Sequence, residues 1–124
     1  MTSPVFIFIL ASDPKLIESI NLALAPIEAR FLSFLSAAAV LDCLETLHPD
    51  LLIAEGELAQ EKNGQLLSVL NNAPHNVPVI LITKDGAVDE AVVAMHLGVL
   101  DCIERRYVAL QLGSRVRVAL REHT

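Results

Sequence analysis

The chain alternates between short, continuous apolar runs and longer segments in which apolar residues recur every three or four positions. The short runs contain many branched aliphatic residues, which is typical of strands that are buried on both faces of a parallel sheet. They lie at residues 5–10, 29–35, 51–54, 77–83 and 100–103. The sequence therefore predicts five strands, each separated from the next by a segment with helical periodicity.

The intervening segments predict five helices, and two of these have clear end signals. Asp13 and Pro14 form an N-cap followed by proline at the first helical position, and Ser36 supplies a second cap. Pro26 and Pro49 mark the ends of the same two helices. The remaining helices are expected at residues 64–72, 87–97 and 107–122.

The regular alternation of strand and helix predicts the fold class. Right-handed crossovers between parallel strands place helices on both faces of the sheet. We therefore expect a single-domain α/β sandwich of the doubly wound (βα)5 type, with the five strands in the order 2-1-3-4-5. Function in such sheets gathers at the carboxyl ends of the strands. Glu55 follows the third strand there, and the polar segment 55–63 is expected to be an exposed loop.

Composition narrows the class of protein. The 124 residues are 53% hydrophobic and only 4% aromatic, which indicates one domain with an aliphatic core. No apolar run reaches the roughly 18 to 20 residues that cross a bilayer, and no secretory signal is visible. Cys43 and Cys102 lack the spacing of metal or redox sites. We expect a cytoplasmic protein with two reduced thiols and no membrane association.

The charge is unevenly distributed along the chain. The net charge of −6 argues against nucleic acid binding by this domain. Residues 1–104 hold 14 acidic and 4 basic side chains, whereas residues 105–124 hold 1 acidic and 5 basic ones. The end of the chain is therefore expected to be a basic helix.

Four segments, in this order and at these intervals, resemble the receiver domains of bacterial response regulators. They are Asp13-Pro14 after the first strand, then residues 49–55, 78–83 and 98–107. The resemblance covers nearly the whole chain, so residues 1–124 are expected to be one receiver-like domain with no output domain in this chain. It implies a flavodoxin-like fold and a role in two-component signal transduction and phosphorelay.

The resemblance also implies which residues occupy the metal site of the family. Active receivers hold a magnesium ion with two acids after the first strand, and here Ala11 and Ser12 occupy those places. Asp13 matches the acid that often follows the pair, and we interpret it as a helix cap rather than a metal ligand. The sequence thus predicts no bound metal and no cofactor.

Glu55 occupies the place of the aspartate that accepts the phosphoryl group in the family. Its carboxylate lies one methylene farther from the backbone, and a displacement near 1 Å can lower the rate of in-line attack by about a hundredfold. Two interpretations follow. Glu55 is a solvated carboxylate at a strand end, or it partially imitates the phosphorylated state by reaching toward the place of the phosphoryl group.

Three further positions correspond to the switch machinery of the family. Thr83 matches the hydroxyl residue that senses the phosphoryl group, and Arg105 replaces the lysine that contacts the acceptor. Cys102 replaces the switch aromatic on the fifth strand. Without a ring at that position, the usual rotamer coupling has no moving part.

These changes predict a pseudo-receiver that is not an enzyme and acts by protein–protein interaction, with a fused output domain, another signalling protein or a second copy as partner. One alternative is a phosphorylatable receiver that uses Glu55 or another acid. Another is an unrelated α/β enzyme or nucleotide binder, although the turn at residues 11–14 lacks the glycines of phosphate-binding loops.

Receivers commonly associate through the fourth helix, the fifth strand and the fifth helix. This chain has acids in the first two of these elements and arginines in the last. This pattern predicts a homodimer in which each acid patch meets the partner's basic patch, because two-fold interfaces are self-complementary. The candidate residues are Asp89, Glu90, Asp101, Arg115, Arg117 and Arg121.

Overall fold

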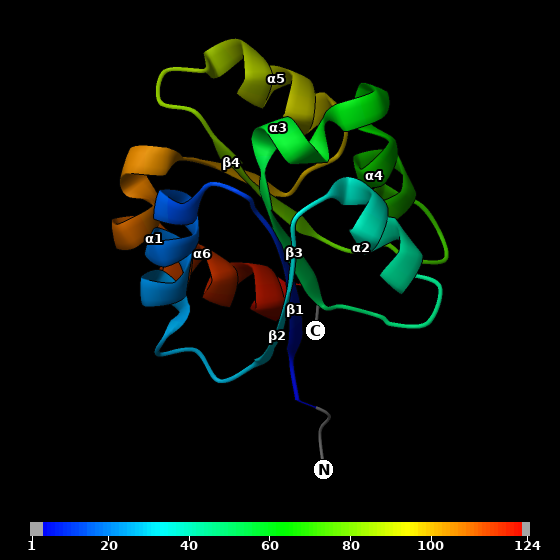
Figure 1. Ribbon diagram of the computed structural model, residues 1–124, viewed down its shortest axis with the longest axis horizontal. Coiled ribbons are helices and arrows are strands. Elements are labelled where there is room, and N and C mark those ends of the chain that lie inside the picture. Colours follow the sequence, from blue (N-terminus) through cyan, green and yellow to red (C-terminus); the bar gives the residue numbers. More distant parts are fainter. Residues whose placement is uncertain (1–3, 123–124) are drawn as a thin grey trace.

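The computed structural model describes residues 4–122 and contains one five-stranded, all-parallel sheet (Figure 1). The strand order is β2-β1-β3-β4-β5, which confirms the predicted order. The strands are β1 (Phe6–Leu10), β2 (Arg30–Phe34), β3 (Leu51–Glu55), β4 (Val79–Thr83) and β5 (Asp101–Glu104). Each lies within one residue or two of the apolar run that predicted it.

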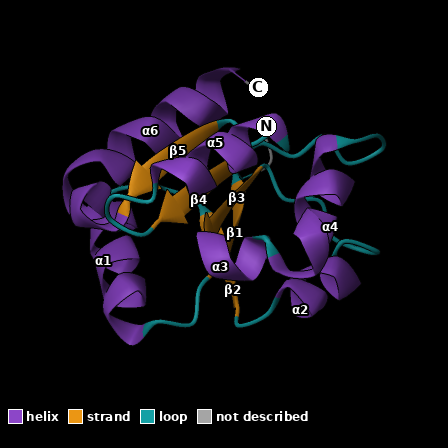
Figure 2. Ribbon diagram, turned by 90° about the horizontal axis from the view of Figure 1, so that it is seen from above, coloured by secondary structure: helices purple, strands orange, loops and turns teal. Residues whose placement is uncertain are grey.

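Helices connect the strands and cover both faces of the sheet (Figure 2). They are α1 (Pro14–Leu24), α2 (Ala37–Cys43), α3 (Gly56–Ala59), α4 (Glu61–Asn71), α5 (Val88–His96), a 3-10 turn η1 (Arg105–Tyr107) and α6 (Val108–Glu122). The predicted caps of the first two helices are confirmed. Asp13 accepts a hydrogen bond from the Lys15 amide at 3.0 Å, and Ser36 accepts one from the Ala39 amide at 3.2 Å.

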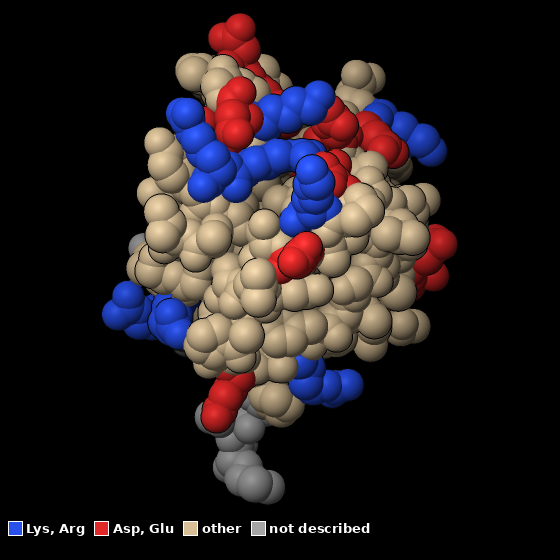
Figure 3. All heavy atoms as spheres, turned by 60° about the vertical axis from the view of Figure 1, so that its left-hand side comes forward, with Lys and Arg blue, Asp and Glu red and all other residues tan. Residues whose placement is uncertain are grey.

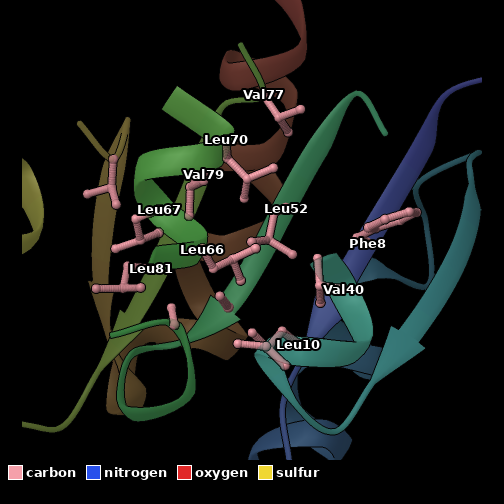
Figure 4. Packing of buried hydrophobic residues seen from close by; sticks show 14 of the residues in the cluster. Phe8, Leu10, Val40, Leu52, Leu66, Leu67, Leu70, Val77, Val79 and Leu81 are labelled. Atoms are coloured by element: carbon pink, nitrogen blue, oxygen red, sulfur yellow. The ribbon is translucent and has the colours of Figure 1, made fainter. Parts of the chain in front are cut away.

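The sheet separates two hydrophobic cores. Phe8, Leu52 and Leu81 face α2, α4 and α5, and they pack with residues such as Val40 and Leu67 (Figure 4). The opposite face packs against α1 and α6. Its members include Ile7, Ile53, Ile80, Leu16, Ile20, Leu112 and Val116. Because the strands β1, β3 and β4 are covered on both sides, they are apolar at nearly every position.

The segment after β3 differs from the prediction. The exposed loop expected over residues 55–63 is wrong for Gly56–Ala59, which forms α3. Ala59 is fully buried and packs with core residues of α2 and α4. This contact holds the short helix against the core, but the polar residues around Ala59 gave the segment the pattern of an exposed loop. Lys62, Asn63 and Gly64 then adopt left-handed backbone angles, with φ of 52°, 58° and 75°. Regular α4 helix therefore begins only after Gly64, near the predicted start.

Within residues 4–122, no helix is long and apolar enough to cross a membrane.

Candidate functional site

The side chains predicted to carry function lie where the parallel strands end. Glu55 is the last residue of β3, and Ala11 to Asp13 connect β1 to α1. Thr83 is the last residue of β4, and Arg105 begins η1 directly after β5. Since the strands are parallel, these positions meet at one edge of the sheet.

Glu55 is buried, with only 4% of its surface exposed. Its Oε1 accepts hydrogen bonds from the backbone amides of Ser12 at 3.0 Å and Asp13 at 3.2 Å. These amides begin the turn that leads into α1, where the helix dipole favours a negative charge. The interpretation of Glu55 as a solvated carboxylate is therefore wrong, because its extra methylene lets it reach the amides that precede α1.

Arg105 supplies the cation of the site. One guanidinium nitrogen, Nη1, lies 2.6 Å from Asp13 Oδ2, and Nη2 lies 3.3 Å from Glu55 Oε2. The guanidinium thus bridges two carboxylates from different elements. Its Nε is buried without a hydrogen-bond partner among the described residues, so the planar group is oriented by its two terminal nitrogens alone.

Asp13 has two roles, one with each carboxylate oxygen. Oδ1 caps α1 through the Lys15 amide, and Oδ2 receives Arg105. The hydrogen bond from Arg105, followed by that from the Lys15 amide, lowers the pKa of Asp13 below its usual value. The sequence predicted the cap but did not predict the ion pair, because Arg105 lies 92 residues away along the chain.

Three predicted positions, Ala11, Thr83 and Cys102, take no part in the hydrogen bonds and ion pairs of Glu55, Asp13 and Arg105 described above. Ala11 is buried in the α1–α6 core, and its amide donates to the Phe34 carbonyl at 3.1 Å. Thr83 is buried at 2% exposure. Cys102 lies under α5, with Sγ 4.0 Å from the Ala91 carbonyl oxygen. Burial, followed by the charges of Asp101 and Glu90, raises the pKa of the Cys102 thiol to about 11.

Two further contacts beside the site were not predicted. Lys84, directly after β4, forms an ion pair with Glu57 of α3, and this pairing raises the pKa of Lys84 and lowers that of Glu57. Glu104 Oε2 accepts a hydrogen bond from the Gly86 amide at 3.1 Å. The loop after β4 is thus tied both to α3 and to the end of β5. In the sequence, Lys84 directly after the fourth strand and the following Asp85-Gly86 turn were the signals that could have indicated these contacts.

The six charged residues predicted to form an interaction surface lie on α5, β5 and α6, and two of them pair with each other. Arg115 Nη1 lies 2.7 Å from both carboxylate oxygens of Asp101 in the same chain, so this pair is already satisfied internally. Arg117 and Arg121 are exposed on α6, and Asp89 is exposed on α5. Figure 3 shows charges of both signs crowded at the end of the molecule where the strands end, with few charges across the middle of that face.

Comparison with known families identifies the family of the chain. The family model described as the response regulator receiver domain matches residues 7–117. The chain belongs to the response regulator receiver domain family. The predicted resemblance is therefore confirmed for the fold and the family. The comparison with curated proteins returned no significant match.

Solved structures of other receivers share this fold at low sequence identity. The receiver domain of an HD domain-containing protein from Pseudomonas fluorescens Pf-5 is 20% identical, with a TM-score of 0.86, and the match covers 99% of this chain and 91% of that one. Full-length FixJ from B. japonicum is 24% identical, with a TM-score of 0.83, and the match covers 98% of this chain and 60% of that one. The response regulator RcsB from Salmonella typhimurium, whose structure was studied for its interaction with DNA, is 17% identical, with a TM-score of 0.79. The match covers 98% of this chain and 61% of that one.

The residues of this receiver do not fit the magnesium ion that the family implies. Magnesium requires several oxygen ligands in octahedral geometry. Here Ala11 offers no side-chain oxygen. Asp13 Oδ2 and Glu55 Oε2 are paired with the Arg105 guanidinium. No group of three metal-ligating side chains occurs in the part of the chain that the structure describes.

Proposed function

We propose that this receiver domain acts in two-component signalling through contact with a protein partner, without accepting a phosphoryl group. The observation that carries the proposal is the position of Arg105, whose guanidinium lies between Asp13 Oδ2 and Glu55 Oε2. The two carboxylates at the acid and acceptor positions are thus already paired with a cation of the chain itself, which leaves neither of them free to hold a metal ion.

The environment of Glu55 supports the same proposal. In-line attack requires a carboxylate oxygen that can approach the phosphorus atom. Oε1 of Glu55 already accepts two backbone amides, and Oε2 faces Arg105. The carboxylate is also buried, so a phosphodonor has little access to it. The phosphorylatable alternative would need the whole group to rearrange before reaction.

The test is incubation of the protein with a small phosphodonor and magnesium, followed by intact mass measurement. We expect no added phosphate, while an active receiver treated in parallel gains the expected mass. An acid-labile adduct on Glu55 would overturn the proposal. Beryllofluoride, which mimics an aspartyl phosphate, should leave the amide spectrum unchanged, and shifts that spread from Thr83 to Cys102 would count against it.

The partner is proposed to be an output domain, another signalling protein or a second copy. For a homodimer through α5, β5 and α6, the candidate charges that form no ion pair among residues 4–122 are those of Asp89, Glu90, Arg117 and Arg121. Reversing Arg117 and Arg121 to glutamate should shift such a dimer toward monomer in sedimentation, and raised salt should do the same. A parent protein that is monomeric at high micromolar concentration excludes this interface.

A further inference from the structure

A groove of about 600 Å³ runs between α5 and the segment formed by α3 and the start of α4. Its lining combines carboxylates, amides and aliphatic side chains. The lining residues are Glu57, Gln60, Asn63, Gly64, Asp89, Glu90, Val93 and Leu97. This groove lies outside the Asp13–Glu55–Arg105 group.

Two glycines bring the walls of this groove together. A Cβ at Gly56 would clash with Glu90 Oε1, and a Cβ at Gly64 would lie 3.0 Å from Leu97 Cδ1. Glu90 and Leu97 of α5 can therefore rest directly against the backbone of the opposite wall. Gly64 also has φ of +75°, which disfavours any other residue there. The wall at Gly64 is thus constrained by its backbone conformation, whereas the wall at Gly56 depends on the flexible carboxylate of Glu90.

The charge of the groove is negative and only partly neutralised. Glu57 pairs with Lys84 at the rim. Asp89 and Glu90 have no ion pair among residues 4–122. The carboxylates do not form a metal-binding group within those residues, which argues against a divalent cation as the occupant. Phosphate-bearing ligands would be repelled.

Apolar surface continues from the groove across the outer face of α5. Val93, which lines the groove, is 53% exposed, and Val92 and Met95, which lie three positions apart on the outer face of α5, are each 51% exposed. At about 100° per residue, Val92 and Val93 adjoin on the helix surface. An occupant that covers both the groove and this strip must be longer than a small organic cation, and it must carry apolar groups beside its positive charge.

We infer that this groove binds a basic, amphipathic helical segment of a partner protein, whose arginine or lysine side chains face Asp89 and Glu90 and whose apolar side chains cover Val92, Val93 and Leu97. The inference rests on the proposed function, because it names the chemistry of the partner of a receiver that works by contact. A second copy of this chain is the less complementary occupant, because the apolar side of its own basic helix, α6, is buried against α1 and the sheet.

The test is titration of the isotope-labelled protein with a designed peptide, followed through its amide spectrum. The probe is a capped peptide of about 14 residues, long enough to form a helix, with leucines at i, i+3, i+4 and i+7 and arginines beside them. A matched peptide carries glutamates in place of the arginines. We expect the arginine peptide to give saturable shifts in Gly56–Ala59, Asn63, Gly64 and the α5 amides, and the glutamate peptide to give none.

Variants of the protein locate the binding site. Asp89→Asn with Glu90→Gln should weaken arginine-peptide binding about three- to tenfold, since exposed charge pairs are individually weak. Asp42→Asn with Glu45→Gln removes the same charge from exposed positions at α2 and should leave binding unchanged. Thermal melting checks that each variant is folded.

Several outcomes would overturn the inference. These are shifts centred elsewhere, equal binding of the two peptides, equal loss in both double variants, or spermine producing the same shifts at the same concentration as the peptide. If the arginine peptide does not bind at the groove, the result of the phosphodonor experiment still stands. A phosphorylated Glu55, in contrast, would overturn the proposed function whatever the groove binds.

Discussion

Helices α5 and α6 flank the same edge strand, β5, from opposite faces of the sheet, and they are anchored to it very differently. Val108, Leu112, Val116 and Ala119 of α6 are buried, whereas Ala94 is the one buried residue of α5. The valines of α5 at positions 88, 92 and 93 are all more than half exposed.

The charged residues of the two helices also differ in how they are paired. Arg105, just before α6, and Arg115, within it, pair with carboxylates of other elements. Asp89 and Glu90 of α5 form no ion pair among the described residues. The contrast teaches that α6 contributes to the stability of the domain, while α5 presents apolar and acidic groups that another molecule can contact.

The largest expected effect separates the two helices by stability. Leu112→Ala removes a fully buried side chain of α6 and should lower the free energy of unfolding by about 2–5 kcal/mol. Met95→Ala, on the exposed face of α5, should change it by no more than about 0.5 kcal/mol. Urea unfolding measures both. Comparable losses would mean that α5 is as strongly anchored as α6.

The next effect concerns the arginine that precedes α6. Arg105→Met leaves the buried Glu55 carboxylate without its cation and should cost about 1–3 kcal/mol of unfolding free energy. Adding Glu55→Gln should recover part of the loss, because the amide oxygen can still accept from Ser12 and Asp13. Arg115→Met, which breaks a more exposed pair, is the control and should cost about 0–1 kcal/mol. Equal losses would contradict the contrast.

Cys102 reports whether α5 stays on the sheet, because its thiol lies beneath that helix. With a pKa of about 11, its thiolate fraction at pH 8 is more than about a hundredfold lower than that of a thiol with a pKa of about 8.5. A more basic thiolate is intrinsically more nucleophilic, which recovers part of this difference. In a Cys43→Ser background, alkylation should be about tenfold slower in the folded than in the urea-unfolded protein. Equal rates would show that α5 opens readily.

The smallest expected effect is a pH dependence of the free energy of unfolding that comes from the Asp13–Arg105 pair and not from the acids of α5. The pKa of Asp13 is lowered in the folded protein, chiefly by Arg105, so its contribution to stability is complete above the unfolded pKa. It is lost as the pH falls below about 4 and through the lower folded value. Asp13→Asn should therefore flatten the acid side of the stability curve. Asp89→Asn is the control, and an identical change in both variants would contradict the assignment.

The fold was predictable because its signals are local. Asp13, Pro14 and Ser36 cap helices through residues two or three positions away, and the apolar runs are long enough to specify buried strands. Segment 56–63 was not predictable in the same way. Burial of Ala59 depends on packing with residues of α2 and α4, which the local sequence does not encode, and the left-handed angles at Lys62 and Asn63 interrupt the helix before Gly64.

The site was predictable as a set of positions and not as a set of contacts. Strand ends placed Glu55 and Arg105 at one edge of the sheet, and the resemblance assigned them to the acceptor and cation positions. Glu55 is buried like the rest of β3, and its Oε1 accepts a hydrogen bond from the Ser12 amide, which lies 43 residues away along the chain. The pairing of Arg115 with Asp101 depends on how α6 lies against β5, so the sequence left both residues as candidates for an intermolecular surface.

The bridge made by Arg105 has a consequence for how the domain responds to its surroundings. A metal ion in solution exchanges, and a protein that binds one gains stability according to the ion's free concentration. The guanidinium is covalently part of the chain, so the positive charge beside Asp13 and Glu55 has no dissociation equilibrium and cannot be removed by a chelator. Melting curves recorded with excess magnesium and with a chelator, at matched ionic strength, should therefore coincide.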